Sequence, residues 1–420
     1  MKTFQHVTFV LLLIFAGMAS AFAGISIDSS RIIFQSSDDA RGRSVGVTSS
    51  VSSVAPYLVR AQVSRDIEGN NVQTPFITTP SLFRLEPGST NQVLVVKKPG
   101  ADGLATDRES LFYFRSVAMP AGEKQSASPS SVVGGSLQVS TATVVKLFYR
   151  PGGLALPQQQ AMGMLQFSST GQGLRVTNPT PYYITLADLK VAGVRVPLSA
   201  VAGNTMIAPF GAQLYARAPH QGRVEWKAIN DYGGTEGFMV RSAKPLSGVA
   251  LACVLVSSGI QAADTAEVNF TAQISDGTCD VQLSQSSLQF GIHKAVDFQS
   301  GATVAMLPLT ATVICSGATT PKMSVSGSTP YSDSTIFRDP GSVATGVGFM
   351  VRQDTGDIDL GSFYNPSQAV SNNVSFALSP VGNAGTPHNE PFLLGLVRAG
   401  IESVTPGAVK STLTFTVSFD

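Results

Sequence analysis

Short apolar runs separated by turn-forming residues recur along this chain of 420 residues and restrict what it can fold into. No apolar stripe of helical period and useful length follows residue 23. The 40 glycines and 24 prolines supply residues that form turns between strands. These features predict an all-β fold, with two immunoglobulin-like β-sandwich domains before residue 239. Examples of the runs are Ile25–Ile27, Pro56–Arg60, Asn91–Val96 and Leu111–Phe114.

Two stretches have the composition of a secretory signal peptide. Residues Met1–Ala23 contain a lysine, an apolar run and Ala-Phe-Ala, and residues Met239–Ala262 contain Arg241, Lys244, an apolar run and Ile-Gln-Ala. Because an export signal belongs at an N-terminus, the second copy indicates that two exported proteins are joined end to end. The alternative is one membrane-spanning helix, for which residues 246–262 are barely long enough.

Charge and histidine content argue against several classes of function. The 28 basic and 27 acidic residues are balanced, which gives no indication of a nucleic-acid partner. The four histidines are far apart, and no metal-ligand spacing or Ser/His/Asp pattern is present. We therefore expect no enzyme activity, no metal, no cofactor and no small-molecule substrate.

The three cysteines differ in their surroundings. Cys253 lies in the second apolar run and would leave with a cleaved signal. Cys279 and Cys315 then remain as a pair in an exported protein, where a disulfide is expected. A metal site would need further ligands nearby.

The first half of the chain contains five segments that resemble, in the same order, the periplasmic pilus chaperones of the chaperone–usher pathway, the PapD-like family. The resemblance covers residues 24–238 and implies a signal peptide at 1–23, an N-terminal domain at 24–151 and a C-terminal domain at 152–238, with fimbrial pilin subunits and an outer-membrane usher as partners. The segments are Ile25–Phe34, Asp107–Pro120, Lys146–Pro151, Leu174–Tyr183 and Trp226–Gly234.

Two cations match the family positions that anchor the terminal carboxylate of a bound pilin between the domains. These are Arg31, in the first segment, and Lys146, near the end of the long strand. Two fixed cations in a partly desolvated site suit one carboxylate. Arg115 departs from the family, which usually has Asn or Cys at this position.

The segment Leu137–Pro151 is predicted to be one long strand, preceded by a mobile polar loop from Pro120. In the family this strand pairs with pilins, whose immunoglobulin-like fold lacks its last strand, and so takes the place of that strand. Alternate side chains, here called plugs, would fill the groove that the missing strand leaves in the pilin, and Thr141 would fill it less well than a large apolar residue. The loop leaves the short-loop or long-loop subfamily open. The plug residues expected on one face are Leu137, Val139, Thr141 and Val145.

After an internal signal-like segment at 239–262, residues 263–420 resemble a fimbrial pilin with an incomplete immunoglobulin-like fold. The resemblance implies that an alternating N-terminal extension is donated to the next subunit. It also implies that the strand ending near Phe419 borders the groove, and that Asp420 presents a carboxylate to Arg31 and Lys146. The residues of the pilin donor strand are Val268, Phe270, Ala272 and Ile274.

The resulting hypothesis is a periplasmic chaperone that binds, folds and caps fimbrial subunits by donor-strand complementation, with a pilin fused to its C-terminal side. The alternative is a structural fimbrial subunit in which the chaperone half is a gene-fusion passenger. Cleavage after Ala262 would release the pilin part for cell-surface fimbriae, whereas an uncut chain would allow the long strand to fill the pilin groove of its own chain.

Overall fold

The computed structural model describes residues 23–51, 53, 55–101, 103–120, 132–199, 202–216, 218, 219, 221–240, 244, 245, 279–299, 301–315, 321–378 and 386–418. Some predicted features lie outside these residues. They are residues 1–22, most of the internal signal-like segment, the pilin donor strand with Val268, Phe270, Ala272 and Ile274, and the final positions Phe419 and Asp420.

The N-terminal domain is a sandwich of two sheets, in which apolar side chains alternate along the strands. In β4, for example, Tyr57, Val59, Ala61 and Val63 are buried on one face. The first sheet contains β1 (Ala23–Ile27), β3 (Arg43–Ser49), β7 (Thr90–Lys97) and β5 (Phe76–Thr79). The second contains β9 (Val132–Arg150), β8 (Ser110–Pro120), β4 (Tyr57–Ser64), β6 (Leu82–Leu85) and β2 (Arg31–Gln35), with a 3-10 turn η1 (Ser36–Asp38) after β2.

The second domain is a smaller sandwich with its own core around Trp226, whose indole Nε1 donates to the carbonyl oxygen of Met162 at 3.0 Å. The short helix α2 (Gln158–Met162) packs Ala161 and Met162 into this core. No helix among the described residues is long and apolar enough to cross a membrane. One sheet is β15 (Ala212–Tyr215), β11 (Gly173–Thr177), β10 (Gln166–Thr170) and β18 (Lys244–Pro245). The other is β13 (Val194–Arg195), β12 (Ile184–Val191), β16 (Val224–Ile229) and β17 (Thr235–Val240), with β14 (Met206–Ile207) beside β12.

The start of the internal signal-like segment belongs to this second domain. Strand β17 continues through Met239 and Val240. Lys244 and Pro245 then pair in parallel with β10. The sheets of the second domain therefore extend a few residues beyond the expected boundary at 238.

The described part of the third domain contains eight strands, two of which are joined by a disulfide. Cys279 and Cys315 are aligned on neighbouring antiparallel strands and are bonded to each other. Two 3-10 turns, η2 (Ala295–Asp297) and η3 (Pro366–Gln368), lie between strands. The strands are β19 (Cys279–Leu283), β20 (Ser287–Lys294), β21 (Thr303–Cys315), β22 (Lys322–Ser326), β23 (Val347–Gln353), β24 (Ser375–Ala377), β25 (Pro387–Arg398) and β26 (Gly407–Ser418).

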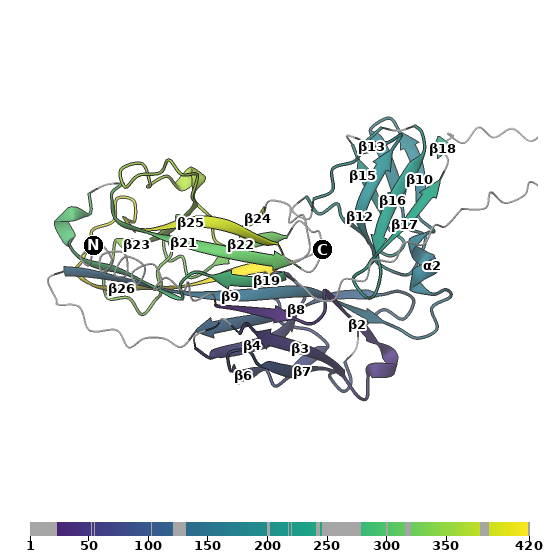
Figure 1. Cartoon of the computed structure of the whole chain (residues 1–420), viewed down its shortest axis with the longest axis horizontal. Coiled ribbons are helices and arrows are strands. Elements are labelled where there is room, and N and C mark those ends of the chain that lie inside the picture. The colour runs from purple at the N-terminus through teal and green to yellow at the C-terminus, as the bar shows by residue number, and fades with distance from the viewer. Residues whose placement is uncertain are drawn as a thin grey trace, which may run out of the picture.

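The sheets of the first and third domains are continuous with each other (Figure 1). One sheet has the order β23-β25-β21-β19-β1-β3-β7-β5, and its joint is the antiparallel pair β1 and β19. The other has the order β24-β22-β26-β9-β8-β4-β6, and its joint is β9. Neither domain therefore exposes an edge at these joints.

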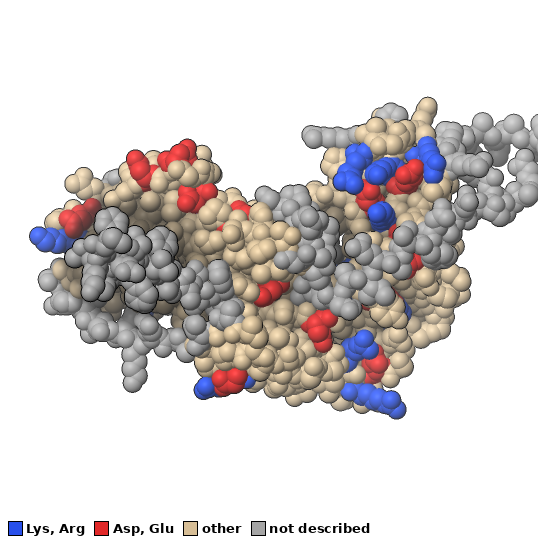
Figure 2. Space-filling view, in the orientation of Figure 1, with Lys and Arg blue, Asp and Glu red and all other residues tan. Residues whose placement is uncertain are grey.

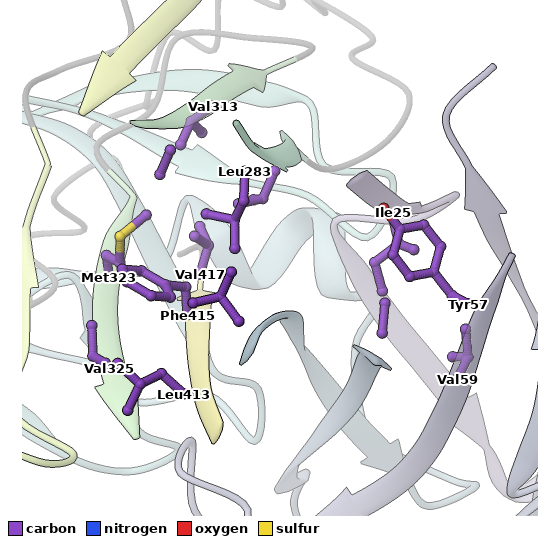
Figure 3. Packing of buried hydrophobic residues seen from close by; sticks show 14 of the residues in the cluster. Ile25, Tyr57, Val59, Leu283, Val313, Met323, Val325, Leu413, Phe415 and Val417 are labelled. Atoms are coloured by element: carbon purple, nitrogen blue, oxygen red, sulfur yellow. The ribbon is translucent and has the colours of Figure 1, made fainter. Parts of the chain in front are cut away.

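A single cluster of buried apolar side chains runs through both joined domains. Figure 3 shows part of it, with Phe415 and Val417 of β26 beside Met323 of β22 in the third domain. Ile25 and Tyr57, which belong to the first domain, lie in the same cluster. The two domains share one core, whereas the second domain has a core of its own.

Candidate functional site

Strand β9 is paired along both of its edges by strands from two domains. On one edge, β20 of the third domain pairs antiparallel with its first half, and β8 of the first domain pairs with its second half. On the other edge, β26 runs parallel to it from Gly407, aligned with Val133, to Ser418, aligned with Val144. Strand β2 then continues that edge with Arg31 aligned with Lys146. The N-terminal half of β9 therefore lies between two strands of the third domain.

The same face of β9 contributes to both domains, because side chains alternate along a strand. Val133, Leu137 and Val139 are at most 1% exposed, and they pair with strands of the third domain. Leu147 and Tyr149 belong to the core on the side of the first domain. Val145, expected among the plugs, lies beyond the stretch that pairs with β26 and is aligned with Phe114 of β8.

Strand β9 begins at Val132, five residues before the predicted start at Leu137. The earlier residues include Gly134 and Gly135, which the sequence analysis assigned to a loop. A Cβ atom on Gly135 would lie 3.0 Å from Cδ2 of Leu396 and 3.1 Å from Cβ of Phe290. Glycine fits here because the core of the third domain already occupies the space that a plug would fill.

Thr141 is buried, and its hydroxyl has no hydrogen-bond partner among the described residues. It is aligned with Phe415 of β26 and Ala118 of β8, at the point where the two domains meet. A buried hydroxyl without a partner is destabilising. We expect Thr141→Val to raise the free energy of unfolding by about 1 kcal/mol in urea titrations. An unchanged or lower value would show that the hydroxyl has a partner.

Arg31 and Lys146 lie side by side on the other face of β9, and both are buried, at 7% and 5% exposure. The guanidinium of Arg31 lies over the ring of Phe148, with 6.0 Å from Cζ to the ring centroid. Phe148 in turn contacts Tyr183 of the second domain, at 5.6 Å between centroids. The two cations therefore occupy the face of β9 that is turned toward the second domain. Two neighbouring buried cations favour an anion at this place.

A second group of charges joins the first and second domains. Arg150, at the end of β9, donates to both carboxylate oxygens of Asp231, each at 2.7 Å. It also donates through Nε to Glu109 at 2.8 Å. The other oxygen of Glu109 accepts from the backbone amide of Tyr183 at 2.9 Å. This group was missed in the sequence analysis, although Glu109 and Asp231 both lie in the quoted family segments.

Burial raises the pKa of Glu109 to about 7, against a usual value of 4.5, although Arg150 acts in the opposite direction. Burial also acts to lower the pKa of Arg150, but its bonds and attraction to Asp231 and Glu109 raise it overall. The Glu109 carboxyl thus binds a proton more tightly in the folded protein than in the unfolded chain.

A raised folded pKa means that the contribution of Glu109 to stability is present below pH 4.5 and is lost as the pH rises to about 7. We expect wild-type protein to lose about 3 kcal/mol of stability from this group across that window. Glu109→Gln, which does not titrate, should lack this loss. Urea unfolding of both proteins at pH 5 and pH 8 measures it, and identical pH dependence would contradict the assignment.

The visible surface carries scattered charges of both signs, separated by large uncharged areas (Figure 2). Among the described residues, no group of three or more His, Cys, Asp or Glu side chains is arranged to hold a metal ion. The features that stand out are therefore the shared strand and the two buried charge groups.

The geometry defines a double sandwich whose long strand β9 also pairs with two strands of a third domain. Family models match all three domains. Residues 24–155 match the "Pili and flagellar-assembly chaperone, PapD N-terminal domain", and residues 160–237 match the "Pili assembly chaperone PapD, C-terminal domain". Residues 268–420 match "Fimbrial protein".

Curated relatives point to the same family. The probable fimbrial chaperone protein ElfD of Escherichia coli K12 is 35% identical over 228 residues, which cover 54% of this chain and 90% of that protein. The chaperone protein FimC of the same strain is 32% identical over 237 residues, with 54% and 91% covered. The chain belongs to the PapD-like pilus chaperones, a family of periplasmic, non-enzymatic proteins, and carries a fimbrial protein domain after the chaperone domains.

Solved structures are also similar to the chaperone half. The crystal structure of the E. coli chaperone DraB is 28% identical, covers 52% of this chain and 95% of that chain, and has a TM-score of 0.43. The structure of the Salmonella enterica SafA pilin in complex with the SafB chaperone is 27% identical and covers 52% of this chain and 95% of that chain. Its TM-score is 0.42.

Proposed function

We propose that this protein is a periplasmic chaperone that folds and caps fimbrial subunits by strand donation, and that its first client is the pilin domain of its own chain. The observation that supports this is the pairing of β9 with β26 and β20, which places Val133, Leu137 and Val139 in the core of the third domain. Backbone hydrogen bonds supply general affinity, and alternate side chains set the register. Because donor and groove share one chain, their effective concentration is high.

The carboxylate anchor belongs to this proposal. Ser418 is aligned with Val144, two residues before Lys146 along β9. A carboxylate presented just beyond β26 would therefore come level with Lys146 and Arg31, and would balance their charge. Other pilin subunits and an outer-membrane usher are the further partners that we propose.

Periplasmic co-expression of the two halves tests the proposal. Residues 239–420, exported by their own signal-like segment, should accumulate as folded protein only when residues 1–245, which include β17 and β18, are present in the same cell. Equal accumulation without the chaperone half would contradict strand donation, because the pilin would then be complete alone.

The anchor predicts a separate effect. Lys146→Ala should weaken the binding of the pilin and increase its digestion by protease at least about tenfold, since a charge-assisted hydrogen bond contributes about 1.5–3 kcal/mol. Lys190, which lies in the second domain and is paired with Asp188, offers the control Lys190→Ala. Unchanged digestion of the pilin half in Lys146→Ala would count against the anchor.

The match of residues 268–420 to fimbrial proteins supports the second candidate, a structural subunit accompanied by a passenger chaperone. Immunoblots of periplasm with an antibody to each half show whether the chain is cleaved after Ala262 or stays uncut. We expect two bands, produced by cleavage after Ala262. A single full-length band seen by both antibodies would contradict cleavage and leave a working fusion.

A further inference from the structure

Arg115 is a buried cation at the border between the chaperone and the pilin, and the proposed function does not explain it. It lies on β8, aligned with Gln62 of β4 and Val144 of β9. Its exposed fraction is 6%. A guanidinium so little exposed needs partners within the protein, because an unpaired buried charge is destabilising by several kcal/mol.

The guanidinium of Arg115 reaches across β9 to the pilin. Its Nη2 donates to the hydroxyl oxygen of Thr416 on β26 at 3.0 Å, and its Nη1 donates to the carbonyl oxygen of Ile67 at 3.3 Å. Thr416 is 3% exposed and is aligned with Ala142 of β9. The bond to Thr416 is therefore buried and shielded from water, where such bonds contribute most.

A loop of the chaperone around Gly69 packs against Arg115. A Cβ atom on Gly69 would lie 2.8 Å from Cδ of Arg115, so the loop backbone rests on the side chain. The carboxylate of Asp66 accepts from the backbone amides of Asn70 and Asn71 and holds the loop closed. Burial lowers the pKa of Arg115, and the negative charges of Glu68 and Asp66 offset part of this effect.

The carboxylates that act on the charge of Arg115, those of Glu68 and Asp66, thus belong to the chaperone itself. The group of the pilin that accepts a hydrogen bond from the guanidinium is neutral: it is the hydroxyl of Thr416. This contact lies on the opposite face of β26 from Phe415 and Val417, which point into the shared core. The chaperone therefore contacts both faces of β26: apolar side chains of β9 pack against the face in the core, and Arg115 binds the opposite face.

We propose that Arg115 selects the client: it favours pilins with a hydroxyl side chain at the position of Thr416 and disfavours an aliphatic or cationic one there. An aliphatic side chain would leave the Nη2 group unpaired, and a cation would be repelled. This inference rests on the proposed strand donation and adds a specificity residue outside the groove.

A double-mutant cycle in the full-length chain tests it, with protease digestion of the pilin half as the measurement and the chaperone half as internal reference. Thr416→Val should increase the opening equilibrium of the pilin half about tenfold when Arg115 is present, since a hydrogen bond to a charged group is lost. In an Arg115→Met background the same change should have less than about twofold effect. Equal effects in the two backgrounds would overturn the proposal.

Variants of Thr416 alone keep the test valid if Arg115→Met does not fold. Digestion should increase in the order Thr, Ser, Val, Lys at this position, with Thr416→Ser close to wild type. Thr414→Val is the matched control, because Thr414 lies on the same face of β26 but is aligned with Ser140. If Thr416→Ser is digested as fast as Thr416→Val, the hydroxyl is not recognised and the proposal fails.

The plug variant Leu137→Asp distinguishes this inference from the proposed function. If the pilin half of Leu137→Asp stays as protected as in wild type, strand donation itself fails. If that half becomes sensitive while Thr416→Val has the same effect with and without Arg115, strand donation stands and client selection by Arg115 is wrong.

Discussion

Replacing Leu137 with Asp should abolish the protease resistance of the pilin domain while the second chaperone domain stays folded. Leu137 is 1% exposed and belongs to the core that the first and third domains share. The substitution removes a buried aliphatic side chain and puts a carboxylate in its place, at a loss of at least about 3 kcal/mol. Limited proteolysis of the full-length chain, followed with an antibody to each half, measures the effect.

The matched control is Gln138→Asp, which introduces the same charge at the next residue of β9. Gln138 is half-buried on the opposite face, where its amide donates to the carbonyl oxygen of Pro120. We expect a loss of about 1 kcal/mol for this bond. Equal sensitivity of the two variants would mean that the face of β9 turned to the pilin core has no special role.

The second large effect is expected at Arg150. Its replacement by Met leaves Glu109, whose side chain is 2% exposed, and Asp231 without their cation. Removing one partner of a buried ion pair is destabilising by about 3–5 kcal/mol. Urea unfolding of the chaperone half should therefore shift to clearly lower urea. The shift should be smaller at pH 5 than at pH 8, because Glu109 is neutral at the lower pH.

Arg108→Met provides the comparison for Arg150→Met. Arg108 pairs with Asp107, but these side chains are 44% and 60% exposed. An ion pair in water contributes little to stability. Similar losses for Arg150→Met and Arg108→Met would show that the buried group does not join the two chaperone domains.

The all-β fold and the family were predicted correctly from the sequence. Apolar and polar residues alternate along segments such as Tyr57–Ser64, and this pattern indicates which face of a strand is buried. The segments that resemble the family are long and occur in the expected order. The Cys279–Cys315 disulfide was also predicted, since only one pair remains outside the apolar run of Cys253.

What the sequence did not reveal depends on contacts between distant residues. Gly134 and Gly135 look like a loop locally, yet they lie in β9, where both pair with β26 and Gly134 also pairs with β20. In the group of Glu109, Arg150 and Asp231, the bonded pair Arg150 and Asp231 is separated by 81 positions. No spacing rule reports such a contact. The roles of Arg31 and Lys146 stay predictions, although the structure places the two cations side by side.

A disulfide between β9 and β26 tests the central claim most directly. Ser140 and Thr414 are aligned on adjacent parallel strands, and such strands are about 4.8 Å apart, within the range that a disulfide bridges. In a Cys253→Ser background, Ser140→Cys with Thr414→Cys should oxidise within one chaperone–pilin unit. Ser140→Cys with Lys410→Cys, four residues out of register, should not. Failure of the aligned pair to form the bond, or its formation only between separate units, would contradict donation of β9 to the pilin of the same chain.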